Sequence, residues 1–238
     1  MVNDIIFKEL IKRGYSLEGE KKAWNIADSK LWYLTEEQAK SFIDLEAKDS
    51  KQKMFVSKEL ELIKKHFNEL IPGLENKPLN IVDLGCGNGE KALALIKNFK
   101  NKSKLRYCPI DISNFMVNTA FKSVSGIKGL NQVKLKNNVL SFLDFNDVSD
   151  SIRKGDFKTN YLLLLGGNLE NSDVHELLHE IRSSMKEGDY FLIGNKLTHP
   201  NPEKMVAYYN NNKYVDNMLI KTIEKLGLNK SDVSYGAR

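Results

Sequence analysis

A chain of 238 residues with 41% apolar and 28% charged side chains can bury one substantial core, which favours a globular α/β protein with helical additions. Its net charge of +5 comes from lysines mixed with acids rather than from a basic arm, so no nucleic-acid partner is expected. No apolar run approaches the ~20 residues that span a bilayer, and Asp4, Lys8 and Glu9 interrupt the N-terminal apolar positions, unlike in a signal peptide. No membrane partner is therefore expected. Cys86 and Cys108, the only cysteines, are predicted to be reduced core residues of a cytoplasmic protein.

The N-terminal third of the chain is predicted to be an all-helical segment, residues 1–74. Its hydrophobic spacing predicts helices over three stretches, residues 4–13, 35–47 and 51–70. Thr35 and Gln38 have the spacing of a capping box, which satisfies the first free N–H groups of the second helix. The third helix has an apolar stripe made of Phe55, Leu62, Ile63, Phe67 and Leu70.

The next stretch indicates a ligand-binding loop. Residues 79–84 form a short apolar run, typical of a buried parallel strand, and Gly85, Gly87 and Gly89 follow it before strong helix formers resume. A dinucleotide-binding G-x-G-x-x-G motif would need its third glycine at position 90, where this chain has Glu90. A second predicted strand ends at Asp111, whose carboxylate could accept both hydroxyls of a ribose. An ordinary turn followed by a strand-end acid is the less favoured interpretation.

The rest of the chain alternates strands and helices. Further strands are expected at residues 105–111, 133–135, 161–165 and 190–193, and helices follow Asp111, follow Asp173 as an N-cap, and occupy most of residues 202–226. This alternation predicts a doubly wound, mainly parallel, Rossmann-like sheet over residues 75–196, followed by a helical region over residues 197–238.

The glycine loop resembles motif I of the class I S-adenosylmethionine-dependent methyltransferases. Beyond that motif, several stretches resemble the histidine-specific methyltransferases of the ergothioneine pathway, which trimethylate the α-amine of histidine. The matching stretches are residues 83–91 (DLGCGNGEK), 107–113 (YCPIDIS), 165–171 (LGGNLEN), 207–210 (AYYN) and, more loosely, 32–35 (WYLT). The resemblance implies S-adenosyl-L-methionine as cofactor.

The resemblance also implies roles for individual residues. The cofactor would be bound by Gly85, Cys86, Gly87, Lys91, Asp111, Ser113, Asn138 and Gly166, with Lys91 on its carboxylate. Asn171 and Tyr208 would be the catalytic positions that hold the acceptor, and Tyr33 would lie near them. Glu170 replaces the family's glycine and Asn138 its usual Asp, although an amide can still bond adenine. Without these roles, Lys91 would be a solvated lysine and Asn171 and Tyr208 turn and packing residues.

A competing motif lies at residues 175–179, HELLH, which matches the zinc-hydrolase pattern H-E-x-x-H, with Glu203 as a third ligand. Val174, Leu177, Leu178, Ile181 and Met185 instead have the spacing of a buried stripe, which directs both histidines away from the cofactor edge. No metal is therefore expected.

The sequence thus predicts an N-methyltransferase that acts on the α-amine of histidine or of a similar small amino acid. The alternatives are a protein that binds the cofactor without transferring methyl groups and a methyltransferase for a protein or peptide. The strand at residues 190–193 is expected to be an uncovered sheet edge of an incomplete catalytic unit, which would self-associate. The mass of the chain in solution, measured together with its turnover, tests this last expectation.

Overall fold

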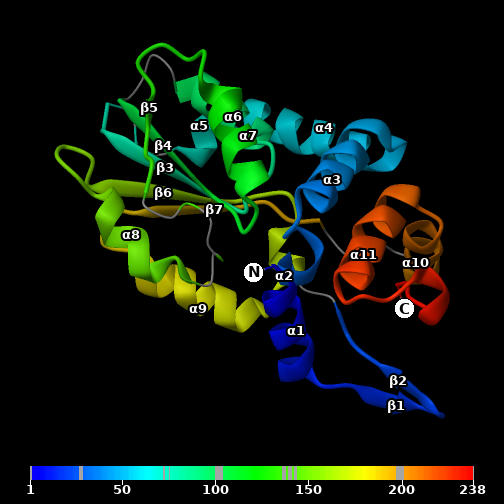
Figure 1. Cartoon of the computed structure of the whole chain (residues 1–238). Helices are drawn as coiled ribbons and strands as arrows, with labels where there is room; N and C mark the ends of the chain where they lie inside the picture. Colours follow the sequence, from blue (N-terminus) through cyan, green and yellow to red (C-terminus); the bar gives the residue numbers. More distant parts are fainter. Residues whose placement is uncertain are drawn as a thin grey trace. The chain divides into compact units, whose positions relative to one another are not determined.

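The computed structural model divides the chain into two compact units (Figure 1). Unit 1 comprises residues 1–49 and 197–238, and unit 2 comprises residues 50–196. The structure describes residues 2–26, 29–71, 73–74, 76–99, 104–135, 138, 141, 144–196 and 201–237. Residues 50–74 are thus grouped with the sheet, and the chain enters and leaves unit 2 once each.

Unit 2 contains a five-stranded parallel sheet. Its strands are β3 (Leu79–Leu84), β4 (Leu105–Ile110), β5 (Asn131–Gln132), β6 (Thr159–Leu164) and β7 (Tyr190–Ile193). They are arranged in the order β5-β4-β3-β6-β7, and every neighbouring pair is parallel. The chain therefore starts in the middle of the sheet and winds outward in both directions, which is the doubly wound arrangement. The predicted α/β, Rossmann-like fold is confirmed.

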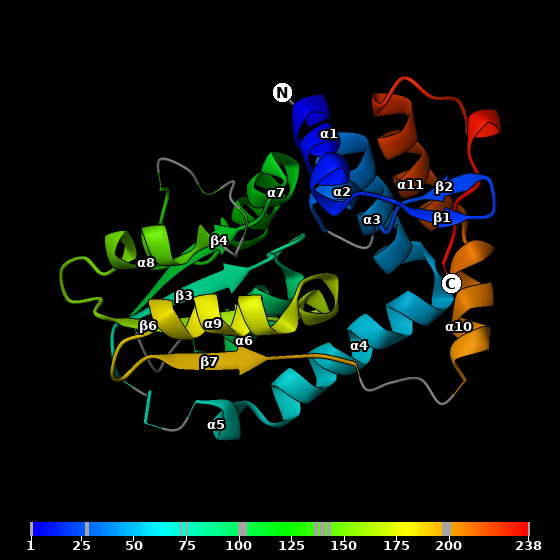
Figure 2. The same cartoon turned by 90° about the horizontal axis from the view of Figure 1, so that it is seen from below.

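Helices cover both faces of this sheet (Figure 1). They are α4 (Ser50–Lys65), α5 (Phe67–Leu70), α6 (Glu90–Phe99), α7 (Asn114–Val124), α8 (Asn146–Ile152), the 3-10 turn η2 (Asn168–Asn171) and α9 (Val174–Ser184). Alternate residues of β3 point into two separate cores. Ile81 packs in the core under α4 to α7, and Val82 packs in the core under α8 and α9, which Figure 2 shows in front of the sheet. Burial on both faces explains why β3 is mostly apolar, with Asn80 and Asp83 as its buried polar residues.

Unit 1 is built around two packed helices. Its elements are α1 (Val2–Arg13), β1 (Ser16–Glu18), β2 (Lys21–Ala23), α2 (Ser29–Trp32), α3 (Glu36–Lys48), α10 (Pro202–Asn210), α11 (Lys213–Lys225) and the 3-10 turn η3 (Lys230–Asp232). The capping box of α3 is present, since Thr35 N–H donates to the Gln38 side chain and Gln38 N–H donates to the Thr35 hydroxyl. The buried amide of Gln38 also donates to Met218 O at 3.1 Å and to the Thr222 hydroxyl at 2.9 Å. One side chain thereby starts α3 and joins it to α11.

Three predictions about local structure were wrong. The N-terminal segment is not all helical, because β1 and β2 form an antiparallel hairpin whose short, exposed strands carry no apolar alternation to reveal them. Leu62 is 57% exposed, since α4 buries a narrow stripe that includes its neighbour Ile63. The outer strand is β5, two residues earlier than predicted, although Val133 N–H still donates to Tyr107 O at 2.8 Å.

Among the described residues, no helix combines the length and the apolar character needed to cross a membrane.

Candidate functional site

Three loops leave the sheet at the carboxyl ends of adjacent parallel strands. The loop after β3 begins at Gly85, Asp111 follows β4, and the loop after β6 contains Gly166. Parallel neighbours all end at the same edge, and open α/β sheets bind their ligands at that edge. The strand order places the β3 loop between the other two.

Two glycines of the β3 loop, Gly85 and Gly87, are explained by different structural features. Gly85 and Gly87 have positive φ values of 67° and 51°, a conformation that side chains disfavour. A Cβ added at Gly85 would also lie 2.5 Å from Nδ2 of Asn168, so only glycine fits there. At Gly87 an added Cβ would meet nothing within 4 Å. The backbone at Gly87 is therefore open to a ligand, directly before the N-terminus of α6.

Asp111 is a buried carboxylate held by backbone donors. Gly87 N–H donates to its Oδ2 at 3.1 Å and Ser113 N–H donates to its Oδ1 at 2.9 Å. Burial raises the pKa of Asp111 to about 6, although the N–H groups of Ser113, Gly87 and Ile112 oppose this shift. A carboxylate oxygen accepts more than one hydrogen bond, so Asp111 can still accept two ribose hydroxyls. The ribose role of Asp111 stays a prediction.

A second buried acid, Asp83, lies at the end of β3. The Tyr107 hydroxyl donates to its Oδ2 at 2.7 Å, and burial raises the pKa of Asp83 to about 7 while the positive charge of Lys91 lowers it. The neighbouring thiols of Cys86 and Cys108 are free and buried. Burial raises the pKa of Cys108 to about 12 and that of Cys86 well above its usual value, so both thiols stay protonated and neither is a nucleophile.

Lys91 and Glu59 meet at the β6 loop. A Cβ added at Gly166 would lie 2.5 Å from Nζ of Lys91, which places the ammonium group directly over that glycine. The carboxylate of Glu59, from α4, accepts the Gly166 N–H at 3.0 Å and lies 3.7 Å from Nζ of Lys91. Sequence reasoning identified Lys91 and Gly166 but missed Glu59, which no motif distinguishes from the other charged residues of its helix.

Two side-chain amides hold these loops in place. Nδ2 of Asn168 donates to Leu165 O at 2.8 Å and Gly85 O at 3.1 Å, and so joins the β6 loop to the β3 loop. The side chain of Asn138 accepts from Leu135 N–H at 2.8 Å and donates to Pro109 O at 3.0 Å, and the backbone carbonyl of Asn138 accepts from Asp111 N–H at 3.3 Å. Asn138 therefore supports the segment that carries Asp111. The role of Asn168 was also missed, although its position lies within the recognised 165–171 stretch.

The predicted acceptor residues belong to both units. Asn171 ends η2 in unit 2 and is half-buried, and the adjacent Glu170 is exposed. In unit 1, the Tyr208 hydroxyl donates to Oδ1 of Asp49 at 2.6 Å. Tyr33 makes an edge-to-face contact with Phe42, also in unit 1, with ring centroids 5.1 Å apart.

The HELLH stretch forms the first two turns of α9. Both His175 and His179 are exposed, and Leu177 is fully buried against the sheet. Val174 and Leu178 are 39% and 38% exposed, so the buried stripe of α9 is narrower than predicted. In the part of the chain that the structure describes, no group of three or more His, Cys, Asp or Glu residues is placed to hold a metal ion.

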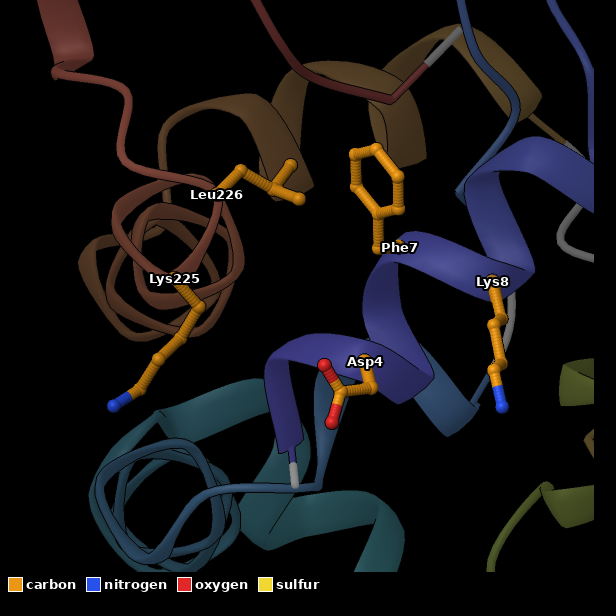
Figure 3. Close-up of a pocket in the computed structure, with 5 residues that line it drawn as sticks. All are labelled: Asp4, Phe7, Lys8, Lys225 and Leu226. Atoms are coloured by element: carbon orange, nitrogen blue, oxygen red, sulfur yellow. The ribbon is translucent and has the colours of Figure 1, made fainter.

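A pocket of about 460 Å³ lies within unit 1, between α1 and the end of α11 (Figure 3). It is lined by Asp4, Phe7, Lys8, Lys225 and Leu226, and the side chain of Leu226 points toward the ring of Phe7. None of these residues belongs to the loops described above. The pocket therefore adds nothing to the ligand-binding edge of the sheet.

Comparisons with solved structures find methyltransferases at low identity. A candidate S-adenosyl-L-methionine-dependent methyltransferase from Methanococcus maripaludis is 17% identical, with a TM-score of 0.44 over 89% of this chain and 76% of its own. Geranyl diphosphate C-methyltransferase from Streptomyces coelicolor A3(2), solved with S-adenosyl-L-homocysteine, is 15% identical, with a TM-score of 0.37 over 79% of this chain and 66% of its own. No relative was found among curated protein sequences.

The comparison with protein families gives a match over most of the chain. Residues 54–229 match the model of the histidine-specific, S-adenosylmethionine-dependent methyltransferases. The matched range contains Glu59, the three loops at the sheet edge, Asn171 and Tyr208. The chain therefore belongs to this family, and it is an S-adenosylmethionine-dependent methyltransferase.

Proposed function

We propose that this methyltransferase acts on the α-amine of histidine or of a similar small amino acid in the cytoplasm. The observation that carries the proposal is the family match over residues 54–229, whose description names histidine as the substrate. The stretches at residues 165–171 and 207–210, which carry Asn171 and Tyr208, support it because they resemble the acceptor-binding stretches of that family.

The proposed cofactor site uses the three loops. Asp111 would accept the ribose hydroxyls, and the backbone at Gly85, Cys86 and Gly87 would lie against the sugar and the sulfur region. Lys91, placed over Gly166, would pair with the carboxylate of the cofactor. Ser113 and Asn138 lie on either side of Asp111 in the hydrogen-bond network, where they would border the adenine, with the Asn138 amide as its polar contact.

The reaction needs positioning more than acid-base chemistry. S-adenosylmethionine supplies a methyl group on a cationic sulfur; transfer forms a nitrogen–carbon bond, breaks the sulfur–carbon bond and leaves a neutral thioether. Asn171 and Tyr208 would orient the amine so that its lone pair faces the methyl group at about 3 Å. The Tyr208 hydroxyl donates its proton to Asp49, and a hydroxyl oxygen that donates in this way can also accept an N–H of the amine. The amine's proton passes to water.

The direct test is mass spectrometry of amino acids incubated with the protein and S-adenosylmethionine. We expect histidine to gain methyl groups and Nα-acetylhistidine, whose amine is blocked, to remain unchanged. Asn171→Ala and Tyr208→Phe should each slow methylation about 10-fold or more while leaving cofactor affinity unchanged, since each removes one acceptor contact.

Other outcomes identify the alternatives. Methylation of a histidine-containing peptide, with free histidine unmodified, would show a peptide or protein acceptor. Methylation of Nα-acetylhistidine as fast as histidine would place the reaction on the imidazole ring. Cofactor binding without methylation of any acceptor would show a protein that binds the cofactor without transfer.

A further inference from the structure

The side chain of Glu59 faces the cofactor edge and has no role in the methyl transfer described above. One of its carboxylate oxygens accepts the Gly166 N–H at 3.0 Å, and the other lies 3.7 Å from Nζ of Lys91. The two side chains are 22% and 18% exposed, so both are largely removed from water but still accessible. At 3.7 Å the two opposite charges attract each other across a distance longer than a hydrogen bond.

The strand order shows which part of the cofactor comes near Glu59. Asp111 follows β4, the open backbone at Gly87 follows β3, and Gly166 follows β6 on the other side of β3. The amide of Asn168 bonds both Gly85 O and Leu165 O, so the second and third loops are in contact. A cofactor whose ribose binds Asp111 and whose carboxylate pairs with Lys91, as proposed above, would therefore have its methionine part near Gly166.

The methionine part is a zwitterion, with one carboxylate and one ammonium group on the same carbon. Lys91 can pair with the carboxylate, but an ammonium group that is removed from water without an anionic partner is costly. Glu59 supplies the matching anion beside Lys91.

We propose that Glu59 binds the α-ammonium group of the cofactor, so that Glu59 and Lys91 together recognise its zwitterionic end. This inference rests on the proposed placement of the carboxylate at Lys91, but not on the identity of the methyl acceptor. Glu59 is a binding residue for the cofactor in this assignment, and its hydrogen bond to Gly166 holds the carboxylate at the end of β6.

Three nucleoside ligands distinguish the contributions that the two charged groups of the zwitterion make to binding. S-adenosylhomocysteine carries both charged groups, its decarboxylated analogue carries only the ammonium, and 5′-methylthioadenosine carries neither. In Glu59→Gln, the amide oxygen can still accept the Gly166 N–H, so the variant removes the charge and keeps the structural bond. Glu61→Gln is the matched control, because Glu61 is an exposed residue of the same helix.

Calorimetry with these ligands gives a distinct pattern. Glu59→Gln should weaken S-adenosylhomocysteine and the decarboxylated analogue by about 10-fold each, the value of one charge-assisted contact, and leave 5′-methylthioadenosine within about 2-fold. Lys91→Met should weaken S-adenosylhomocysteine but not the decarboxylated analogue. Glu61→Gln should change none of the three.

Equal weakening of all three ligands by Glu59→Gln would show that Glu59 only supports the loop, and no change for any ligand would show that it has no role; both results overturn the proposal. If Glu59→Gln fails to fold, Glu59→Asp keeps the charge on a shorter side chain and should weaken the two amine-bearing ligands without weakening 5′-methylthioadenosine. Because all ligands are nucleosides, the pattern is independent of whether histidine is methylated.

Discussion

The two ends of the cofactor edge are built differently. At the β4 end, Asp111 is 8% exposed and is held by backbone N–H groups from Gly87 and Ser113. At the β6 end, Lys91 and Glu59 are side chains from two different helices that meet over Gly166 with about a fifth of their surface exposed. Under the proposed function, the first end would receive hydroxyl groups at a fixed position, and the second would offer an adjustable pair of charges.

This difference fits the chemistry of the two ligand parts that we propose to bind there. Ribose hydroxyls are neutral and need an acceptor at a fixed position, which backbone donors around a buried carboxylate provide. The zwitterionic end needs charges, and long side chains supply them without full burial, which would cost several kcal/mol per unpaired ion. We therefore expect substitutions at the first end to act through geometry and burial, and those at the second end to act through charge.

The largest effect should come from the loop between the two ends. Gly85→Ala forces alanine into a positive φ and places its Cβ 2.5 Å from Nδ2 of Asn168. Asn168 must then move, which disrupts the hydrogen bonds that join the β3 and β6 loops. We expect the free energy of unfolding to fall by about 3 kcal/mol and the affinity for S-adenosylhomocysteine to fall about 100-fold. Urea unfolding and calorimetry measure the two quantities.

The matched control is Gly155→Ala, in the turn before β6. Gly155 has a positive φ of 60°, but an added Cβ there meets nothing within 4 Å. This variant should lose only about 1 kcal/mol of stability, from backbone strain, and should bind S-adenosylhomocysteine normally. Equal losses of affinity in both variants would contradict a specific role for the Gly85 contact.

The second prediction concerns only the buried end, at Asp111, where cofactor affinity should depend on pH. Burial raises the pKa of Asp111 in the free protein to about 6, and ribose hydroxyls that donate to Asp111 favour its ionised form. Binding therefore releases a proton, and affinity should rise as the pH rises toward 6, by at most about 10-fold per pH unit, and then level off. Calorimetry of S-adenosylhomocysteine between pH 5 and 8 measures this slope.

Asp111→Asn should lower the affinity for S-adenosylhomocysteine about 10-fold or more at pH 7.5, because an amide has only one acceptor atom. It should also abolish the increase of affinity with pH below pH 6. Asp111→Ala should weaken binding at least as much. Unchanged affinity in Asp111→Ala would refute the ribose assignment. An unchanged pH dependence in Asp111→Asn would show that a group other than Asp111 causes it.

The sequence allowed the position of Asp111 at a strand end to be predicted, but only one of the two charged residues at the other end. The strand end at Asp111 could be predicted because β4 is buried and mostly apolar, with Arg106 as its one charged residue, so the polar Asp111 marks its end in the sequence. The contact between Glu59 and Gly166 joins residues 107 positions apart. Periodicity shows which face of α4 is buried but not which charged residue on its flank reaches the edge of the sheet. Lys91 was identifiable because a family motif contains it.

Local errors had the same origin. The hairpin of β1 and β2 and the short strand β5 bury few apolar side chains, so their backbone pairing leaves no hydrophobic pattern to detect. Asn138 is a different case, because its role at the adenine stays a prediction. Its hydrogen bonds to Pro109 and Leu135 depend on a loop conformation that composition does not encode.

The last prediction concerns Asp83, whose pKa responds to charges at both ends. The pKa of Asp83 is raised to about 7 by burial, lowered by the positive charge of Lys91 at one end and raised by the negative charge of Asp111 at the other. Between its unfolded value near 3.8 and about 7, the folded protein keeps a proton that the unfolded chain has lost, so stability falls as the pH rises. This slope is at most about 1.4 kcal/mol per pH unit and ends near pH 7.

Asp83→Asn keeps an oxygen that accepts the Tyr107 hydroxyl but cannot ionise. The unfolding free energy of this variant minus that of the native protein should therefore increase from pH 5 to pH 7 and then level off toward pH 8. Urea denaturation at each pH measures this difference. Lys91→Met removes the charge that lowers the pKa of Asp83. When both proteins also carry Lys91→Met, the difference in unfolding free energy caused by Asp83→Asn should therefore continue to increase above pH 7. A constant difference between the two proteins across pH 5 to 8 would mean that Asp83 ionises normally despite its burial, and the electrostatic connection between the two ends would be lost.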